Sequence, residues 1–266
     1  RAPRWWYTAL LKKCQNSIRD NSRRFQKATS ALMMASIKNL SVEQRKHIAI
    51  IIALVVHFFG VVGMLSPYAA WFKAATPLNL LLMLALVVFT QVQKNFSFWL
   101  FMFIAFATGM ITEMIGVNTG LLFGDYHYGN VLGLKLYGVP FLIGVNWFVT
   151  VYAATTISVW MHQYITNKYE TIGVTFNKHL MFIMGVLDAA FITVVFDYIM
   201  EPAAIQLGMW QWHTVDIPMF NYTCWYVISA LLAAVMFKLQ LRQTNHFVIH
   251  LLFIEALFFI AIRLFS

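Results

Sequence analysis

Long apolar runs, separated by short polar segments, dominate the chain after residue 47. A helix of roughly 20 apolar residues crosses a bilayer core of about 30 Å, and several runs approach that length. Their pattern predicts seven membrane-spanning helices, the second of which is short enough to be re-entrant instead. The predicted spans are 48–66, 77–92, 96–115, 138–160, 179–200, 222–240 and 246–264.

The composition agrees with an integral membrane protein. Hydrophobic residues make up 61% of the chain and charged residues only 11%, whereas soluble domains carry about 25% charged residues. We therefore predict the all-α class, with a single polytopic helix bundle over residues 48–266. The net charge of +9 comes from basic residues beside the apolar runs, which indicates membrane topology and a lipid bilayer as partner, with no nucleic acid.

Residues 1–47 form a basic segment of different character. The Met-Met-Ala stretch at 33–35 resembles a natural start, so residues 1–32 are predicted to be a leader or a non-native addition. A weak helical stripe between Trp6 and Ile18 leaves an interfacial helix as the alternative.

Lys and Arg are distributed unevenly between the two sides of the predicted membrane. If the N-terminus is cytoplasmic, the inner segments carry more of these residues than the outer ones, as the positive-inside rule requires. We therefore predict a multi-pass protein of the cell's inner (plasma) membrane with a cytoplasmic N-terminus. This topology puts the 116–137 and 201–221 loops together on the outer side.

Acidic side chains gather in and beside the third and fifth predicted spans. A charge at mid-membrane costs about 2.5–3.5 kcal/mol on insertion scales. Asp197 and Glu201 are four residues apart and so share one helix face, and Glu113 lies at their level. We predict that these three meet in one pocket, with Asp188 about 14 Å deeper on the opposite face. The alternative is that each carboxyl only caps a helix or bonds to a neighbouring helix.

The stretch GVNTGLLFGDYHYG at 116–129 combines polar and aromatic side chains with glycines, which permit tight backbone turns. Its Asp125 is a further candidate catalytic carboxyl. An aromatic belt at the membrane interface is the alternative explanation for the ring side chains. The predicted substrate-binding residues are Asn118, Tyr126, Tyr128, Asn146, Trp147, Trp210 and Trp212.

Recognisable metal and cofactor motifs are missing from the sequence. His246 and His250 are spaced i, i+4, but two ligands are too few for a metal site. We find no GxSxG, no P-loop and no GxGxxG after a strand, and the two Cys form no metal-binding pair. The last span also lacks the lysine that a retinal Schiff base needs. We therefore expect neither a metal nor a cofactor.

Three motifs resemble those of the membrane carotenoid-biosynthesis family that contains the carotenoid hydratases. They are EMIGVNTGLLFGDYHYG, LGLKLYGVPFLIGVNW, and D-x8-D-x3-EP followed by GMWQW. The resemblance covers about residues 105–225 and departs at Asn146-Trp147. It implies a hydro-lyase that adds water to the terminal double bond of an acyclic carotenoid end group, on a lycopene or γ-carotene substrate. The functional positions it implies are Glu113, Asp125, Tyr126, Asp188, Asp197 and Glu201.

These residues support acid catalysis of hydration. A carboxylic acid in an apolar site keeps its proton near neutral pH and can pass it to an alkene, while a second, ionised carboxylate deprotonates water. An end-group cyclase would use the same protonation and then lose a proton, so it remains an alternative. A membrane transporter or proton-coupled carrier also remains, because membrane carboxylates mark ion paths, although paired broken helices are not visible.

Overall fold

The computed structural model describes residues 19, 40–173, 175–214, 216–241 and 245–265. The predicted leader and its alternative, an interfacial helix, lie outside the described residues except at Arg19. The chain divides into two compact units, residues 1–45 and residues 46–266. The second unit contains the helix bundle, the strands and the candidate site.

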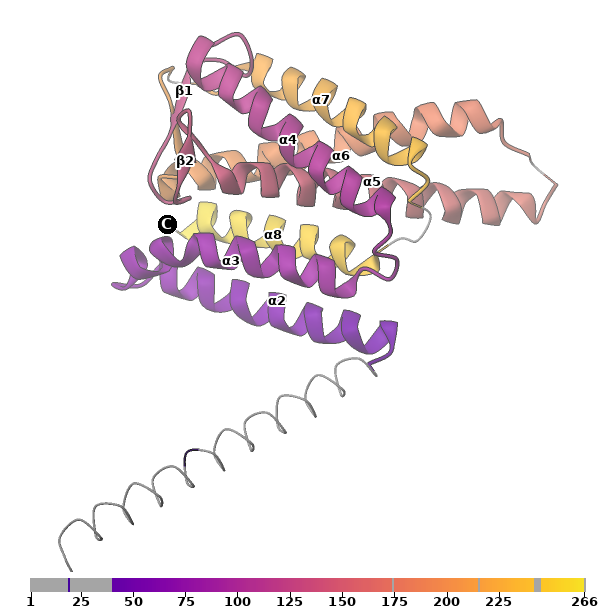
Figure 1. Cartoon of the computed structure of the whole chain (residues 1–266), viewed down its shortest axis with the longest axis horizontal. Coiled ribbons are helices and arrows are strands. Elements are labelled where there is room, and N and C mark those ends of the chain that lie inside the picture. Colours follow the sequence, from indigo (N-terminus) through magenta and orange to yellow (C-terminus); the bar gives the residue numbers. More distant parts are fainter. Residues whose placement is uncertain (1–18, 20–39, 174, 215, 242–244, 266) are drawn as a thin grey trace, which may run out of the picture. The chain divides into compact units, whose positions relative to one another are not determined.

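Within the described residues, seven helices are long and apolar enough to cross a membrane. They confirm the predicted all-α class and the predicted number of spans. Figure 1 shows their arrangement in the bundle. The helices are α2 (Val42–Met64), α3 (Ala69–Thr90), α4 (Phe96–Thr119), α5 (Phe141–Glu170), α6 (Lys178–Leu207), α7 (Met219–Lys238) and α8 (His246–Phe265).

Among the predicted boundaries that are wrong, two fail because prolines lie inside helices. The second span starts at Ala69 and not at residue 77, so it is a full helix of 22 residues with Pro77 in its interior. The fifth span continues through Pro202 to Leu207 rather than ending at residue 200. Proline removes one backbone donor, which usually breaks a helix in water, but neighbouring helices make it tolerable in a membrane bundle.

Short polar caps set the ends of the two helices that supply the acidic residues. The Asn95 side chain accepts a hydrogen bond from Phe98 N at the start of α4, and Asn177 does the same for the first turn of α6. Both helices end at a glycine in the left-handed conformation, Gly120 with φ 67° and Gly208 with φ 75°. Such C-caps satisfy the last carbonyls and turn the chain sharply, which directs it into the loops that carry the aromatic motifs.

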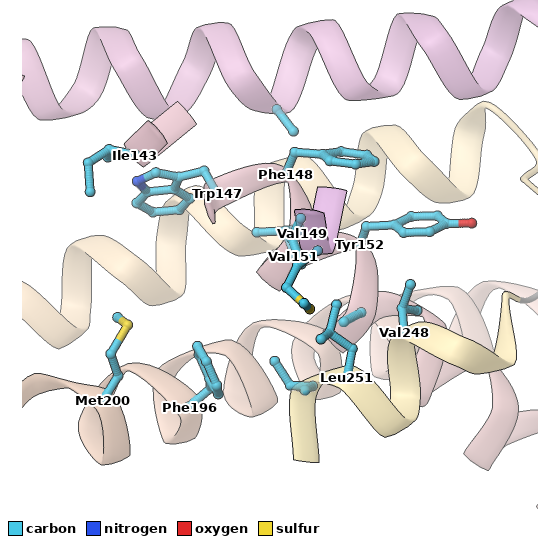
Figure 2. Close-up of a cluster of buried hydrophobic side chains, with 14 of the residues drawn as sticks. Ile143, Trp147, Phe148, Val149, Val151, Tyr152, Phe196, Met200, Val248 and Leu251 are labelled. Atoms are coloured by element: carbon cyan, nitrogen blue, oxygen red, sulfur yellow. The ribbon is translucent and has the colours of Figure 1, made fainter. Parts of the chain in front are cut away.

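Helix α5 is the centre of the bundle. In its most apolar stretch 78% of the residues are buried, and it packs against α3, α4, α6, α7 and α8. Figure 2 shows the apolar core around it, in which Trp147, Phe148 and Tyr152 of α5 lie near side chains of α6 and α8. The rings of Phe148 and Tyr152 stack with centroids 5.5 Å apart. This close packing gives the polar groups of α5 a rigid support.

Two short strands from distant loops pair at one end of the bundle (Figure 1). Strand β1 (Tyr126–Tyr128) follows α4, and strand β4 (Trp210–Trp212) follows α6; they pair antiparallel with Tyr126 opposite Trp212. The strands β2 (Lys135–Leu136) and β3 (Val139–Pro140) form a second hairpin. The two signature loops therefore lie at the same end, as the predicted topology requires.

A glycine permits the two loops to meet. Gly129 N donates a hydrogen bond of 2.9 Å to Met209 O, and a Cβ at residue 129 would lie 2.1 Å from Gly208 O. A side chain has no room at so close a backbone approach, so only glycine allows this contact.

Cysteine labelling tests the predicted orientation. In a background with Cys14→Ser and Cys224→Ser, cysteines at the exposed Asn130 and Thr214 should both react with an impermeant maleimide on intact cells. A cysteine at Thr171, between α5 and α6, is the matched control and should react only after permeabilisation. Labelling of Thr171→Cys alone on intact cells would reverse the orientation.

Candidate functional site

A small buried cavity, here the carboxyl cavity, lies where α4, α5, α6 and α7 meet the paired strands. Its volume is about 30 Å³, which is enough for an ordered water, since that needs at least about 10–15 Å³, and far below the roughly 300–1,000 Å³ of a ligand pocket. The structure brings Glu113, Asp197 and Glu201 together in its wall, as the helix spacing predicts. The lining residues are Glu113, Phe123, Tyr126, Tyr128, Ile143, Asn146, Trp147, Asp197, Met200, Glu201, Trp210, Trp212, Asn221 and Trp225.

Strand β1 and helix α5 hold the Glu113 carboxyl from two sides. Its Oε2 accepts hydrogen bonds from Tyr126 OH and, at 2.7 Å, from Tyr128 OH. Its Oε1 accepts from Trp147 Nε1 at 2.9 Å. Tyr126 and Tyr128 are two residues apart on a strand, so both rings point to the same face. Three donors thus fix the orientation of Glu113.

Strand β4 repeats this arrangement for Glu201. Trp210 Nε1 donates to Glu201 Oε2 at 2.8 Å, and Trp212 Nε1 donates to Oε1 at 2.5 Å. The two indoles are again two residues apart, so the strand pleat turns both toward one carboxyl. The sequences YHY and WQW therefore serve the same purpose on two paired strands, each presenting two ring donors to one buried glutamate.

Asp197 has the fewest hydrogen bonds of the three carboxyls. Its Oδ2 accepts from Asn221 Nδ2 at 3.0 Å, and it is almost completely buried. Within the described part of the chain this is its one hydrogen bond, compared with three for Glu113 and two for Glu201. Asp197 therefore retains most of its hydrogen-bonding capacity for a molecule in the cavity.

The wall of the carboxyl cavity contains three carboxyl groups and, among the described lining residues, no basic side chain to pair with them. Among its described lining residues there is no Lys or Arg, so three ionised carboxylates would repel one another with no counter-ion to offset them. Burial raises the pKa of Tyr126 and of Tyr128, and the charge of Glu113 raises both further. Both phenols therefore stay protonated and act as hydrogen-bond donors at any physiological pH.

Aromatic faces complete the wall. The indoles of Trp147 and Trp225 stack with centroids 3.9 Å apart and an interplanar angle of 8°, and the rings of Tyr126 and Trp212 lie 5.0 Å apart. The negative faces of such rings attract a cation. The site therefore offers proton-holding groups and a surface suited to a carbocation.

Three sequence-predicted residues lie outside the carboxyl cavity. Asp125 has a side chain that is 76% exposed and lies 3.9 Å from His213, because in a strand the residue before Tyr126 points to the opposite face. Asp188 bonds to His162 of α5 at 2.7 Å. Asn118 donates to Tyr137 O at 2.9 Å and so fixes the loop. Their positions do not support the predicted catalytic and substrate-binding roles.

Sequence reasoning missed Asn221 as a member of the site. It is buried in the first turn of α7, and it supplies the one partner of Asp197. The available signal was a lone amide in an apolar helix, three residues after Pro218 and a loop that already carried candidate residues. Trp225, one turn further along, completes the stack on Trp147.

A second, larger cavity adjoins the first. This apolar cavity has a volume of about 330 Å³ and is lined mainly by α2, α3 and α8. Asn146 of α5 lines both cavities. Asn146, one of the predicted substrate-binding residues, therefore lies between the water-sized carboxyl cavity and the ligand-sized apolar cavity.

Comparison with known proteins gives one match. A family model described as "Carotenoid biosynthesis protein" matches residues 75–265, well over half of the chain. The matched region includes every residue that lines the carboxyl cavity. Searches of curated proteins and of solved structures found no match.

Gly109 tests how tightly the site is packed. A Cβ at this position in α4 would lie 2.5 Å from Trp147 Cγ, so Gly109→Ala should displace the indole that bonds to Glu113. We expect the free energy of unfolding to fall by about 1–3 kcal/mol, measured by thermal denaturation in detergent with tryptophan fluorescence. Gly60→Ala is the control, because its Cβ would come no nearer than 3.4 Å to Phe258. Equal midpoints for the two variants would contradict the packing.

Proposed function

The chain belongs to the family of carotenoid biosynthesis proteins, and on this premise we propose that it is a carotenoid hydratase. It adds water to the terminal double bond of an acyclic end group and forms a tertiary alcohol. The observation that carries the proposal is the carboxyl cavity, in which three buried carboxyls surround a water-sized space with no basic residue among the described lining residues. The substrate is a carotenoid of the lycopene or γ-carotene class.

The two adjoining cavities separate the two reactants. The carboxyl cavity has room for water but not for a hydrocarbon chain, and the apolar cavity has about eleven times its volume, about 330 Å³ against about 30 Å³. Asn146 lines both. In the proposed complex the end group reaches Asn146 from the apolar side, and the reacting carbon meets water there.

Addition proceeds in two steps. One carboxylic acid donates its proton to the CH carbon of the terminal double bond. The electron pair of the double bond forms the new C–H bond, and the neighbouring carbon becomes a tertiary cation. The water oxygen then bonds to the cation, and an ionised carboxylate takes the released proton. Atoms balance as alkene plus water giving alcohol, and no electrons enter or leave, so the proposal needs no redox cofactor.

The hydrogen bonds suggest how the roles are divided. Asp197 has the most free capacity, with Asn221 as its one described partner, so we assign it the proton donated to the alkene. Glu113 and Glu201 are held by fixed donors, which suits groups that orient water and accept its proton. The stacked faces of Trp147 and Trp225 stabilise the cation while it exists.

Carboxyl-to-amide variants test this assignment. Glu113→Gln and Asp197→Asn preserve shape but remove proton transfer, so each should lose more than about tenfold of activity, since positioned acids and bases contribute about 10²–10⁴. The measurement is pigment analysis of lycopene- or γ-carotene-producing cells that express each variant. Asp125→Asn, whose side chain is exposed, is the matched control and should retain normal conversion. Near-normal turnover in both cavity variants would rule out the acid mechanism at this site.

The source of the oxygen is a separate test. With purified protein under nitrogen and with chelator, water enriched in heavy oxygen should yield a fully labelled tertiary alcohol. Product that forms only in air, and that takes its oxygen from labelled dioxygen, would identify a hydroxylase. A new ring without added oxygen would identify an end-group cyclase, and movement of unchanged substrate across the membrane would identify a carrier.

A further inference from the structure

The apolar cavity contains features that the hydration chemistry does not use. Its volume of about 330 Å³ lies within the range of small-molecule sites, about 300–1,000 Å³. Aromatic and aliphatic side chains form most of its wall, among them Trp71 and Phe72 of α3 and Phe258 and Phe259 of α8. Such a wall fits a hydrocarbon chain.

A buried carboxyl with no partner among the described residues lines this apolar space. Glu255 of α8 lines the cavity and is only 7% exposed, and within the described part of the chain it makes no hydrogen bond or ion pair. No Lys or Arg is found among the described residues of the wall. A buried polar group normally has a partner, because leaving one unsatisfied costs about 1–3 kcal/mol.

A second acceptor in the same wall also lacks a donor. Asn79 of α3 lines the cavity, and its Oδ1 is buried with no hydrogen-bond partner among the described residues. The imidazole Nδ1 of His57 on α2 is not available as a donor to Glu255 or Asn79, because it already contacts Ala53 O at 2.8 Å. The ring of His57 also packs edge-on against Phe258. The Glu255 carboxyl and Asn79 Oδ1 thus share an apolar cavity, and neither has a hydrogen-bond partner among the described residues.

We propose that the apolar cavity is a binding site for an isoprenoid chain that carries a hydroxyl group, with Glu255 and Asn79 as the residues that recognise the hydroxyl. The isoprenoid class follows from the family, and the presence of an alcohol deepens the proposed function, whose product is a tertiary alcohol. The carboxyl cavity, where the alcohol would form, shares the lining residue Asn146 with this site.

The rim of the cavity agrees with entry from the bilayer. Trp71 and Leu78, both on α3, line the cavity and are 68% and 72% exposed. The helix α3 is long and apolar enough to cross a membrane, and exposed apolar side chains on such a helix contact lipid. A lipid-soluble chain therefore reaches the cavity sideways, and its one polar group finds partners inside.

Binding of farnesol tests the proposal without any turnover. Protein in nanodiscs is crosslinked to a diazirine-bearing farnesol, and the modified peptides are mapped by mass spectrometry. We expect labels in α2, α3 and α8. Free farnesol should compete at least about tenfold better than farnesyl methyl ether, which accepts but cannot donate a hydrogen bond, because the ether leaves the buried acceptors unpaired.

Variants identify the recognising groups. Glu255→Leu should remove the preference for the alcohol while keeping the crosslinks, and Asn79→Leu should reduce it by several-fold. Glu113→Gln, which is inactive under the proposed function, should keep the full preference, so failure of hydration and failure of this site are distinguishable. If Glu255→Leu does not fold, Glu255→Gln and Asn79→Leu decide the question. Equal competition by alcohol and ether, or crosslinks confined to α4–α7, would overturn the proposal.

Discussion

The whole site depends on pairing two strands so that each presents two ring donors to one buried glutamate. A carboxyl can be placed inside a membrane bundle only if its oxygens find partners. Tyr126 and Tyr128 provide them for Glu113, and Trp210 and Trp212 provide them for Glu201. Because β1 and β4 also bond to each other, the two glutamates are held in one rigid frame, and Asp197 completes it.

Hydropathy was sufficient to predict the fold class and the number of spans. It measures the apolar length of a segment, however, and not where the backbone stops being helical. The helix through Pro77 therefore begins earlier than its predicted span, and the helix through Pro202 ends later than its predicted span. Helix α5 likewise continues to Glu170, ten residues past the predicted end of the span, because its last turns are polar yet still helical.

The members of the site could be predicted where helix spacing or depth in the membrane decides, as for Glu113 beside Asp197 and Glu201. Helix periodicity brings Asp197 and Glu201 to one face, and the structure has them there. Neighbouring residues of an extended segment point to opposite faces, so Asp125 lies outside the site although it stands beside Tyr126 in the motif. Asn221 and the apolar cavity come from contacts between helices distant in sequence, which no local motif records.

The backbone contact at Gly129 limits which side of the carboxyl cavity can open. Main-chain bonds join the loop after α4 to the loop after α6, so the two helices cannot separate at that end without breaking the strand pair. The strand pair thus closes the carboxyl cavity on one side, while the apolar cavity opens toward the lipid at the exposed side chains of α3. The two cavities thus differ in the solvent that can supply them: the carboxyl cavity suits a small polar molecule, and the apolar cavity suits a long hydrocarbon that arrives through the bilayer.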